Sequence, residues 1–251
     1  MKRQDIGKQS VLKGSKWLRG MGLVMLMLCA WNGSMGQTPT TIIDVEGLNA
    51  MTATGNYVIT DDINAESYNP SLNAAFTGTL TAQAKADGTF PVISGLTQPL
   101  FTTVTDARIS NIMLKDVTIS QDGYVGAIAC TARGTTRIYN CGILPTTTLY
   151  DNDGSIIGFE GSSLSSNDSY CGGLVGYLDG YARVINCFSY ANITGGTTVA
   201  GLVGYNTTAT MQGNSPNNFN NNVKTMVVNC MFYGDLKGGT TKRPEIGRAH
   251  V

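Results

Sequence analysis

The sequence predicts an all-β protein in which short parallel strands stack, coil upon coil, into a β-helix that a short N-terminal helix covers. Three observations support this prediction: similar segments recur at a fixed spacing, short apolar stretches lack a helical period, and glycine is abundant. Of the 251 residues, 31 are glycine and only 14% are charged. Because an average soluble domain has about 7% glycine and about 25% charged residues, this composition favours many tight turns.

Residues 1–36 are predicted to be a signal peptide. They contain six basic residues and one acidic residue, and the apolar stretch Met21–Trp31 follows the basic residues. This stretch is shorter than the roughly 20 residues that a membrane-spanning helix needs. Ser34 and Gly36 supply the small side chains of a cleavage site. We therefore expect export to the cell surface or the extracellular space, with no stable membrane span after cleavage; a retained anchor and a lipid-modified Cys29 are the alternatives.

Residues 37–105 are expected to form the N-terminal cap and the first coils. Asp44 is a candidate helix cap, and the apolar segment that follows it predicts one or two helical turns. Such a helix would cover the open end of a stacked fold. Short apolar segments bounded by turn residues then predict strands at Tyr57–Thr60, Phe76–Leu80, Phe90–Ile93 and Leu100–Val104.

Residues 106–240 contain two kinds of repeated segment. The first has isoleucine or valine two positions before an asparagine and occurs at Arg108–Ile112, Arg137–Cys141, Arg183–Cys187 and Met226–Cys230. The second is glycine-rich and occurs at Gly126–Ala129, Gly173–Tyr177 and Gly201–Tyr205. Together they define a unit of 28–29 residues with insertions near 145–170 and 206–223. Both insertions are rich in Asn, Ser, Thr and Asp, which predicts surface loops.

Stacking the first kind of segment aligns three columns of side chains. The first is apolar and predicted to point inward: Ile109, Ile138, Val184 and Val227. The second places asparagine at a corner, where it tolerates a left-handed bend and stacked amides can bond one another: Asn111, Asn140, Asn186 and Asn229. The third column consists of Ile112, Cys141, Cys187 and Cys230. Because isoleucine occupies its first position, the column accepts a hydrophobic side chain, and the thiols are expected to act as small apolar groups.

The glycine-rich segments resemble the GLUG motif of bacterial surface proteins. Gly173–Tyr177 and Gly201–Tyr205 carry the resemblance, and the run from Gly55 to Leu96 is similar to the segment that commonly precedes such repeats. The resemblance implies a right-handed, pectin-lyase-like parallel β-helix. Repeats of this kind occur in adhesins, in IgA-specific peptidases and in unassigned secreted proteins. The first unit departs from the pattern, with Ala127 and Ala129 in place of leucine and glycine.

The resemblance implies a function at the bacterial surface. We expect a non-catalytic, adhesin-like binding module or stalk of a larger exported protein. The alternative is an accessory repeat domain of a secreted protease or polysaccharide-degrading enzyme whose catalytic part lies beyond the C-terminus. The expected partner is a host or bacterial surface glycan or protein.

The C-terminal residues 241–251 are predicted to be an unstructured tail. The segment Ile246–Val251 resembles the translation of a sequencing adapter, which implies a truncated fragment. A β-helix without a C-terminal cap exposes unpaired strand edges, so we expect the fragment to self-associate through its last coil. The tail also holds His250, the single histidine of the chain.

The sequence contains no recognisable catalytic, cofactor-binding or metal-binding set, and we therefore expect a protein that is not an enzyme. Glycoside hydrolysis requires two carboxylates held about 5–9 Å apart. The candidate acids fall at different phases of the repeat and are better explained as turn residues: Asp61, Asp62, Asp116, Asp122, Asp179 and Asp235. Asp151–Gly154, with Glu160 beyond, lacks the third acid of an EF-hand loop and is better explained as an Asx-rich turn than as a calcium site.

Charge excludes one class of partner. Residues 37–245 contain 10 basic and 16 acidic residues, a net charge of −6, so we expect no nucleic-acid partner. Four tyrosines near strand ends provide either a sugar-stacking or protein-binding face, or simply the edge of the core: Tyr177, Tyr181, Tyr190 and Tyr205.

An odd number of cysteines follows the predicted signal peptide: Cys130, Cys141, Cys171, Cys187 and Cys230. An odd number of well-spaced cysteines is unlike a disulfide framework, and no Cys-x-x-Cys pair suggests zinc. We expect small buried apolar groups, with one disulfide between neighbouring coils as the alternative.

Overall fold

The computed structural model describes residues 38–69, 75–207, 225–238 and 241–242. The chain divides into two compact units, Met1–Gln37 and Thr38–Val251, and all described residues belong to the second. The predicted signal peptide with Cys29, nearly all of the 206–223 insertion and most of the 241–251 tail lie outside the described residues. No helix within the described part has the length and hydrophobicity needed to span a bilayer.

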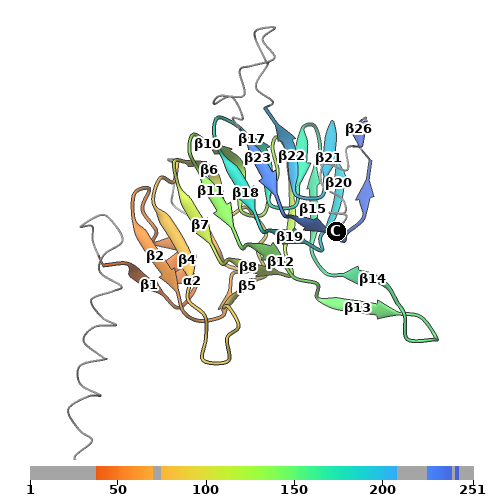
Figure 1. Cartoon of the computed structure of the whole chain (residues 1–251), viewed down its shortest axis with the longest axis horizontal. Helices are drawn as coiled ribbons and strands as arrows, with labels where there is room; N and C mark the ends of the chain where they lie inside the picture. The colour runs from red at the N-terminus through yellow and green to blue at the C-terminus, as the bar shows by residue number, and fades with distance from the viewer. Residues whose placement is uncertain (1–37, 70–74, 208–224, 239–240, 243–251) are drawn as a thin grey trace, which may run out of the picture. The chain divides into compact units, whose positions relative to one another are not determined.

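The described part is all-β, with parallel sheets and one short helix, as the sequence predicts (Figure 1). Sheet A has the order β1 (Thr40–Ile42), β2 (Asn56–Ile59), β4 (Thr79–Ala82), β7 (Arg108–Ser110), β11 (Arg137–Tyr139), β18 (Arg183–Ile185) and β23 (Met226–Val228). Sheet B has the order β3 (Ile63–Asn64), β5 (Val92–Ser94), β8 (Met113–Lys115), β12 (Gly142–Ile143), β19 (Phe188–Ser189) and β24 (Met231–Phe232).

Three further parallel sheets complete the stack. Sheet C has the order β6 (Phe101–Thr105), β10 (Ala129–Arg133), β17 (Val175–Leu178) and β22 (Val203–Asn206). Sheet D has the order β9 (Thr118–Gln121), β15 (Ser163–Ser166), β20 (Asn192–Gly195) and β25 (Leu236–Lys237). Sheet E has the order β16 (Tyr170–Gly172), β21 (Thr198–Ala200) and β26 (Thr241–Lys242). An antiparallel hairpin of β13 (Thr147–Tyr150) and β14 (Ile156–Glu160) stands apart from these sheets.

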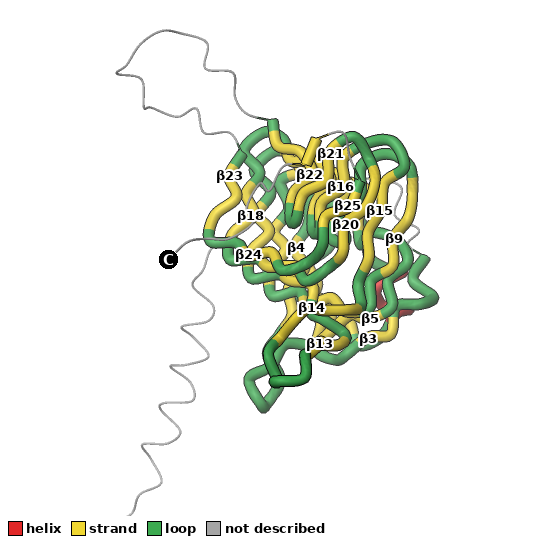
Figure 2. The backbone as a smooth tube through the Cα atoms, turned by 90° about the vertical axis from the view of Figure 1, so that its right-hand side faces the viewer, coloured by secondary structure: helices red, strands yellow, loops and turns green. Residues whose placement is uncertain are grey.

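The chain visits the sheets in a fixed order, which makes each circuit one coil of the stack. From β11 onward it passes through sheets A, B, D, E and C and then returns to A. Each strand pairs in parallel with its equivalent in the next coil; Arg137, for example, pairs with Arg108 on one side and Arg183 on the other. Figure 2 looks along the stack, so that successive coils lie behind one another.

The first glycine-rich segment, at the start of β10, pairs one residue away from the predicted alignment. Ala129 pairs with Val175, and the Ala127 amide donates to the Gly173 carbonyl at 3.1 Å. The glycine-rich motif therefore aligns Gly126 with Gly172 rather than with Gly173. A slip of one residue would turn every side chain of the strand to its other face. In the observed register Ile128 and Leu174 share one fully buried position, and their strand neighbours Ala129 and Val175 share the next.

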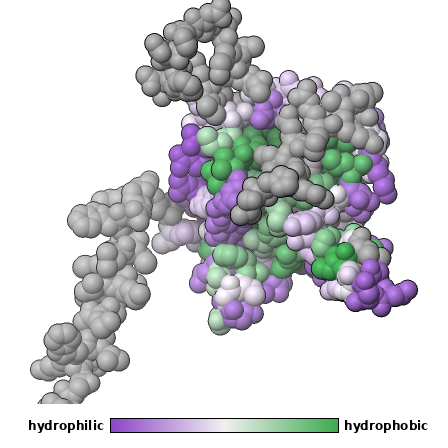
Figure 3. Space-filling model, turned by 45° about the vertical axis from the view of Figure 1, so that its right-hand side comes forward, coloured by the Kyte–Doolittle hydropathy of each residue, from purple (hydrophilic) through white to green (hydrophobic). Residues whose placement is uncertain are grey.

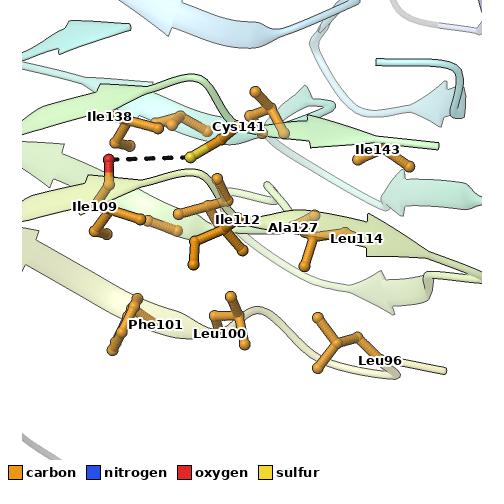
Figure 4. Packing of buried hydrophobic residues seen from close by; sticks show 14 of the residues in the cluster. Leu96, Leu100, Phe101, Ile109, Ile112, Leu114, Ala127, Ile138, Cys141 and Ile143 are labelled. Atoms are coloured by element: carbon orange, nitrogen blue, oxygen red, sulfur yellow. Dashed lines mark hydrogen bonds between the residues drawn. The ribbon is translucent and has the colours of Figure 1, made fainter. Parts of the chain in front are cut away.

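Buried columns of apolar side chains fill the interior of the stack. The predicted inward column is confirmed: Leu80, Ile109, Ile138 and Val184 are fully buried on successive rungs, and Val227 is half-buried at the end of the row. Figure 4 shows part of this core, in which the Cys141 thiol lies 3.9 Å from the Ile109 carbonyl. Burial of such side chains stabilises the fold by about 1.5–3 kcal/mol each.

The five cysteines of the described part are all free and buried. In the predicted thiol column, the Cys141 amide lies 3.5 Å from Cys187 Sγ, and the Cys187 amide lies 3.4 Å from Cys230 Sγ. The sulfur atoms therefore accept weak hydrogen bonds along the stack and pack as small apolar groups, as predicted. Burial raises the pKa of Cys171 to about 12.

The asparagine column is confirmed as a ladder at the corner between sheets A and B. Its four residues have left-handed backbones, with φ of 61° at Asn111, 54° at Asn140 and Asn186, and 52° at Asn229. The side-chain amides of Asn140, Asn186 and Asn229 each donate to the asparagine of the preceding coil, at 3.3, 3.3 and 2.7 Å. The intervals between successive rungs are 29, 46 and 43 residues, so the two longer coils contain the insertions.

The predicted N-terminal helix is also present, as α2 (Val45–Asn49). Asp44 caps it, because its Oδ1 accepts a hydrogen bond from the Gly47 amide at 2.9 Å. Leu48 is fully buried in the core, which fixes the helix against the first coil.

The ladder predicts a graded response to substitution at Asn140. Asn140→Ala loses two amide contacts and replaces asparagine, which tolerates a left-handed backbone, by a residue that tolerates it less well, so we expect the free energy of unfolding to fall by about 2 kcal/mol. Asn140→Gly keeps the backbone conformation and loses only the amide contacts, so its loss is expected to be about half as large. Urea unfolding of both variants measures the difference; equal losses would contradict a left-handed requirement at this corner.

Thiol burial predicts a loss of stability at alkaline pH. The unfolded Cys171 thiol ionises above about pH 9 while the folded thiol stays protonated to about pH 12, so stability falls as the pH rises through this interval. At pH 11 the loss from this group is expected to be about 2.6 kcal/mol relative to pH 8. Unfolding measured from pH 8 to 11 checks this, with Cys171→Ala as the control: its pH slope should be shallower, and an unchanged slope would refute the assignment to Cys171.

Candidate functional site

The β13–β14 hairpin is the largest departure of the described residues from the repeating coil. It lies within the predicted 145–170 insertion, projects away from the stacked strands (Figure 1), and leads into β15 and β16, which continue the coil. Thr148 pairs with Phe159, and Leu149 pairs with Gly158. The hairpin therefore carries side chains that no other coil provides.

The acidic segment at the tip of the hairpin serves as a turn. Asp151 Oδ1 accepts hydrogen bonds from the Asp153 and Ser155 amides, both at 3.0 Å, and Asp153 Oδ1 accepts one from the Ser155 amide at 2.9 Å. These bonds are those of an Asx-rich turn. Among the described residues, no group of three or more His, Cys, Asp or Glu side chains is placed to hold a metal ion.

Three aromatic rings join the hairpin to the stack. Tyr190 and Tyr233 occupy successive rungs just after sheet B, and their rings stack with centroids 5.2 Å apart. Phe159 from β14 meets Tyr190 edge to face at 4.5 Å and lies 6.0 Å from Tyr233. Such contacts contribute about 0.5–1.5 kcal/mol each beyond their burial. Desolvation raises the pKa of Tyr190.

A cavity of about 810 Å³ lies between the hairpin and these rings, and we call it the hairpin groove. Its apolar lining consists of Leu149, Ile156, Phe159, Tyr190 and Tyr233, and its polar lining of Glu160, Asn192, Asp235 and Lys237. Ile156 is 57% exposed and Tyr233 52% exposed, which is high for such large apolar side chains. In Figure 3 hydrophobic surface lies on the projecting hairpin beside a hydrophilic tip.

The groove has the composition of a binding site for a protein or a sugar. Ligand sites combine an apolar lining with a few polar groups that orient the ligand. Lys237 Nζ lies 3.8 Å from Asp235 Oδ2 at the polar side, and Glu160 adds a second carboxylate. Large exposed aromatic side chains are the usual anchors of protein interfaces.

A second aromatic cluster, which we call the tyrosine stack, lies where sheets C and E meet. Tyr177 and Tyr205 pair across β17 and β22 with ring centroids 5.6 Å apart. Tyr124 stacks on Tyr177 at 4.9 Å, and Tyr170 stacks on Tyr205 at 4.6 Å. All four rings are half-buried, so the cluster combines structural packing with an exposed edge.

The four tyrosines named from the sequence do not form one face. Tyr177 and Tyr205 belong to the tyrosine stack, Tyr190 lines the hairpin groove, and Tyr181 is 49% exposed elsewhere. Sequence reasoning missed four partners: Tyr124, Phe159, Tyr170 and Tyr233. Tyr233 follows Cys230 at the interval at which Tyr190 follows Cys187, so the repeat alignment contained that signal.

The acids considered for catalysis each bind a local group. Asp62 accepts hydrogen bonds from the Val92 amide at 2.8 Å and Lys85 Nζ at 3.0 Å, and these bonds lower its pKa. Others accept hydrogen bonds from neighbouring side chains: Asp61 from Thr60, Asp116 from Thr146, Asp122 from Asn167 and Asp179 from Thr207. Asp235 faces Lys237. The contacts of Asp62, Asp116, Asp122 and Asp179 reach residues of a neighbouring coil, and those of Asp61 and Asp235 lie within one turn.

Comparison with known proteins relates the chain to bacterial proteases. Residues 45–143 match the model of the M26 IgA1-specific metallo-endopeptidase N-terminal region. The chain is 31% identical over 153 residues to an immunoglobulin A1 protease of Streptococcus sanguinis. This alignment covers 53% of this chain and 8% of that protein. A solved structure of an IgA1 protease aligns at 18% identity with a TM-score of 0.45, covering 87% of this chain and 21% of the other. The chain thus spans a small fraction of these relatives.

These similarities correct the expectation that the protein is not an enzyme. The matched family region is part of a metallo-endopeptidase, and the similar bacterial protein is a protease. The expectation was wrong because it rested on the catalytic groups of this chain alone, and the part of the chain that matches covers 8% of the length of that relative. The similarity supports a relation to a bacterial protease better than it supports an adhesin.

The tyrosine stack predicts a strict requirement for glycine at position 176. A β-carbon there would lie 2.6 Å from the Val125 amide nitrogen and 2.9 Å from Tyr124 Cβ. Gly176→Ala should therefore lower the free energy of unfolding by about 1–3 kcal/mol. Gly158→Ala in the hairpin is the matched control, because its β-carbon would meet only Leu149 Cδ1 at 3.7 Å. Thermal unfolding of both variants tests this, and equal midpoints would contradict the close packing at Gly176.

Proposed function

We propose that this chain is an N-terminal accessory region of a secreted bacterial protease. The observation that carries the proposal is the match of residues 45–143 to the N-terminal region of the IgA1-specific metallo-endopeptidase family. The predicted signal peptide, residues 1–36, supports the same proposal, because an immunoglobulin substrate is found outside the bacterial cell. The chain then corresponds to the exported N-terminal part of a much longer enzyme.

In this role the region binds a protein that the enzyme acts on, and the hairpin groove is the site. Its exposed Ile156 and Tyr233 provide apolar contact area, while Lys237 and Glu160 provide charged groups at the side. Among the described residues β13 pairs with β14 alone, so the hairpin also offers backbone groups to an extended peptide. We propose immunoglobulin A1, the substrate in the name of the similar protease, as the partner.

We also propose the handedness of the fold, its N-terminal cap and its type of repeat. The parallel order of sheets A to E supports a right-handed, pectin-lyase-like β-helix, because crossovers between parallel strands are right-handed in about 98% of cases. Helix α2 then covers its N-terminal end. The close backbone contacts at Gly176 and Gly204 support GLUG-type repeats, in which glycine is required for packing.

Binding to immobilised immunoglobulin A1 tests the proposed function. We expect the purified chain to bind this antibody, and Tyr233→Ala to weaken the binding about ten-fold, because exposed aromatic anchors contribute more than 1 kcal/mol at protein interfaces. Tyr181→Ala is the matched control, since Tyr181 is 49% exposed and lies outside the groove lining. Surface plasmon resonance measures the affinities.

Two results would contradict this assignment. Absence of binding at concentrations up to about 100 μM would remove the antibody as a partner of this region, and equal effects of the two tyrosine variants would remove the groove as the site. A circular dichroism spectrum of each variant confirms that the substitution has left the fold intact.

A further inference from the structure

Three of the four arginines of the described residues lie in one column on the outer face of sheet A. Arg137 pairs with Arg108 of the preceding coil and with Arg183 of the following one. The residues that follow them in the strands are fully buried, so the arginines project from the opposite face of the sheet. Arg108 and Arg137 are exposed, and Arg183 is half-buried. We call these three residues the arginine column.

This placement is unfavourable for the fold taken alone. Adjacent parallel strands lie about 4.8 Å apart, and like charges directly opposite one another are destabilising. Within the described residues, the ion pairs are Lys85–Asp62 and Lys237–Asp235, and neither involves an arginine. Other coils place uncharged residues at the same position of sheet A: Asn56, Thr79 and Met226. The sheet therefore does not require arginine there.

The acid beside the column is engaged in a turn. Asp106 Oδ1 accepts hydrogen bonds from the Thr135 amide at 2.7 Å and the Thr135 hydroxyl at 2.9 Å. Asp106, Thr135, Arg108 and Arg137 line a hollow of about 250 Å³. The three guanidinium groups together with this carboxylate leave a local excess of positive charge, in a module whose residues 37–245 have a net charge of −6.

Neutral groups that suit a sugar lie on the same face. Tyr139 is two residues along the strand from Arg137 and half-buried, so it projects to the same side. The asparagine ladder runs parallel to the arginine column at the ends of these strands. Each amide of the ladder uses one of its two N–H groups on its neighbour, and the second remains for a ligand hydroxyl.

We propose that the arginine column binds a linear anionic polysaccharide that runs along the stack. Successive arginines take its sulfate or carboxylate groups by paired N–H donors, one such group enters the hollow between Arg108 and Arg137, and Tyr139 packs against a sugar ring. A polysaccharide fits better than a nucleic acid, because the neutral groups beside the column, the amides of the asparagine ladder and Tyr139, suit sugar hydroxyls and a sugar ring.

Binding of polysaccharides by the purified chain tests this site. Isothermal titration calorimetry compares three polymers of equal length: dextran sulfate, polygalacturonate and uncharged dextran. The comparison separates binding of sulfate or carboxylate groups from binding of an uncharged sugar chain. We expect one or both anionic polymers to bind and dextran not to bind. Arg137→Thr copies the residue at Thr79 and should weaken binding about ten-fold, while the midpoint of thermal unfolding stays the same or rises. Lys115→Gln, which removes one positive charge from sheet B, should change the affinity by less than two-fold.

Several results would overturn the proposal. They are absence of binding to both anionic polymers, an equal loss of affinity in Lys115→Gln and Arg137→Thr, and equally tight binding of single-stranded DNA or polyglutamate of matched length. A lower unfolding midpoint in Arg137→Thr would show that the arginine serves the fold instead.

Discussion

The structure depends on one constraint: each strand pairs in parallel, in register, with the same position of the next coil. A residue therefore faces its own equivalents along the stack, and the chemistry of a position is repeated every coil. Apolar residues in such a column bury one another, asparagine amides bond one another, and tyrosine rings stack, as in the rows through Ile138, Asn140 and Tyr177. Charged residues in the same arrangement repel, and this repulsion in the column through Arg137 is the basis of the proposed anionic ligand.

The same constraint separates scaffold from site. Glycines of the repeated motif let backbones approach closely, as at Gly172, where an added β-carbon would lie 2.3 Å from the Val175 carbonyl oxygen. Such positions tolerate no variation, whereas a corner between sheets accepts an insertion without disturbing the rungs on either side. The β13–β14 hairpin occupies a corner of this kind, between β12 of sheet B and β15 of sheet D. Binding residues are commonly placed on loops held by a rigid scaffold, and the binding site that we propose in the hairpin groove would follow this rule.

Much of the stack is predictable from the sequence because its signals are local and repeated. An asparagine before a cysteine or isoleucine predicts both the corner between sheets A and B and its left-handed backbone. The alternation of polar and apolar residues around Ile109 and Ile138 predicts which face of sheet A is buried. The motif alignment that matched Gly126 with Gly173 was wrong by one residue. The pairing of the strands depends on how closely the backbones approach, and similarity of the motifs did not reveal it. The hairpin groove was harder to predict from the sequence. Phe159 lies in an insertion that has no equivalent in another coil, and its contact with Tyr190 joins residues far apart in the chain. The relation to a protease could not come from catalytic residues, because the region that the chain covers is a small part of such enzymes.

The asparagine ladder has a direction. Every amide donates toward the N-terminal end of the stack, from Asn229 to Asn186, then to Asn140 and to Asn111, whose own amide reaches the Thr81 hydroxyl at 3.5 Å. The four amide dipoles consequently add instead of cancelling, and each polarises the next. A row of neutral side chains thus acquires a positive and a negative end, and a change at one rung alters the strength of hydrogen bonds at rungs that it does not touch.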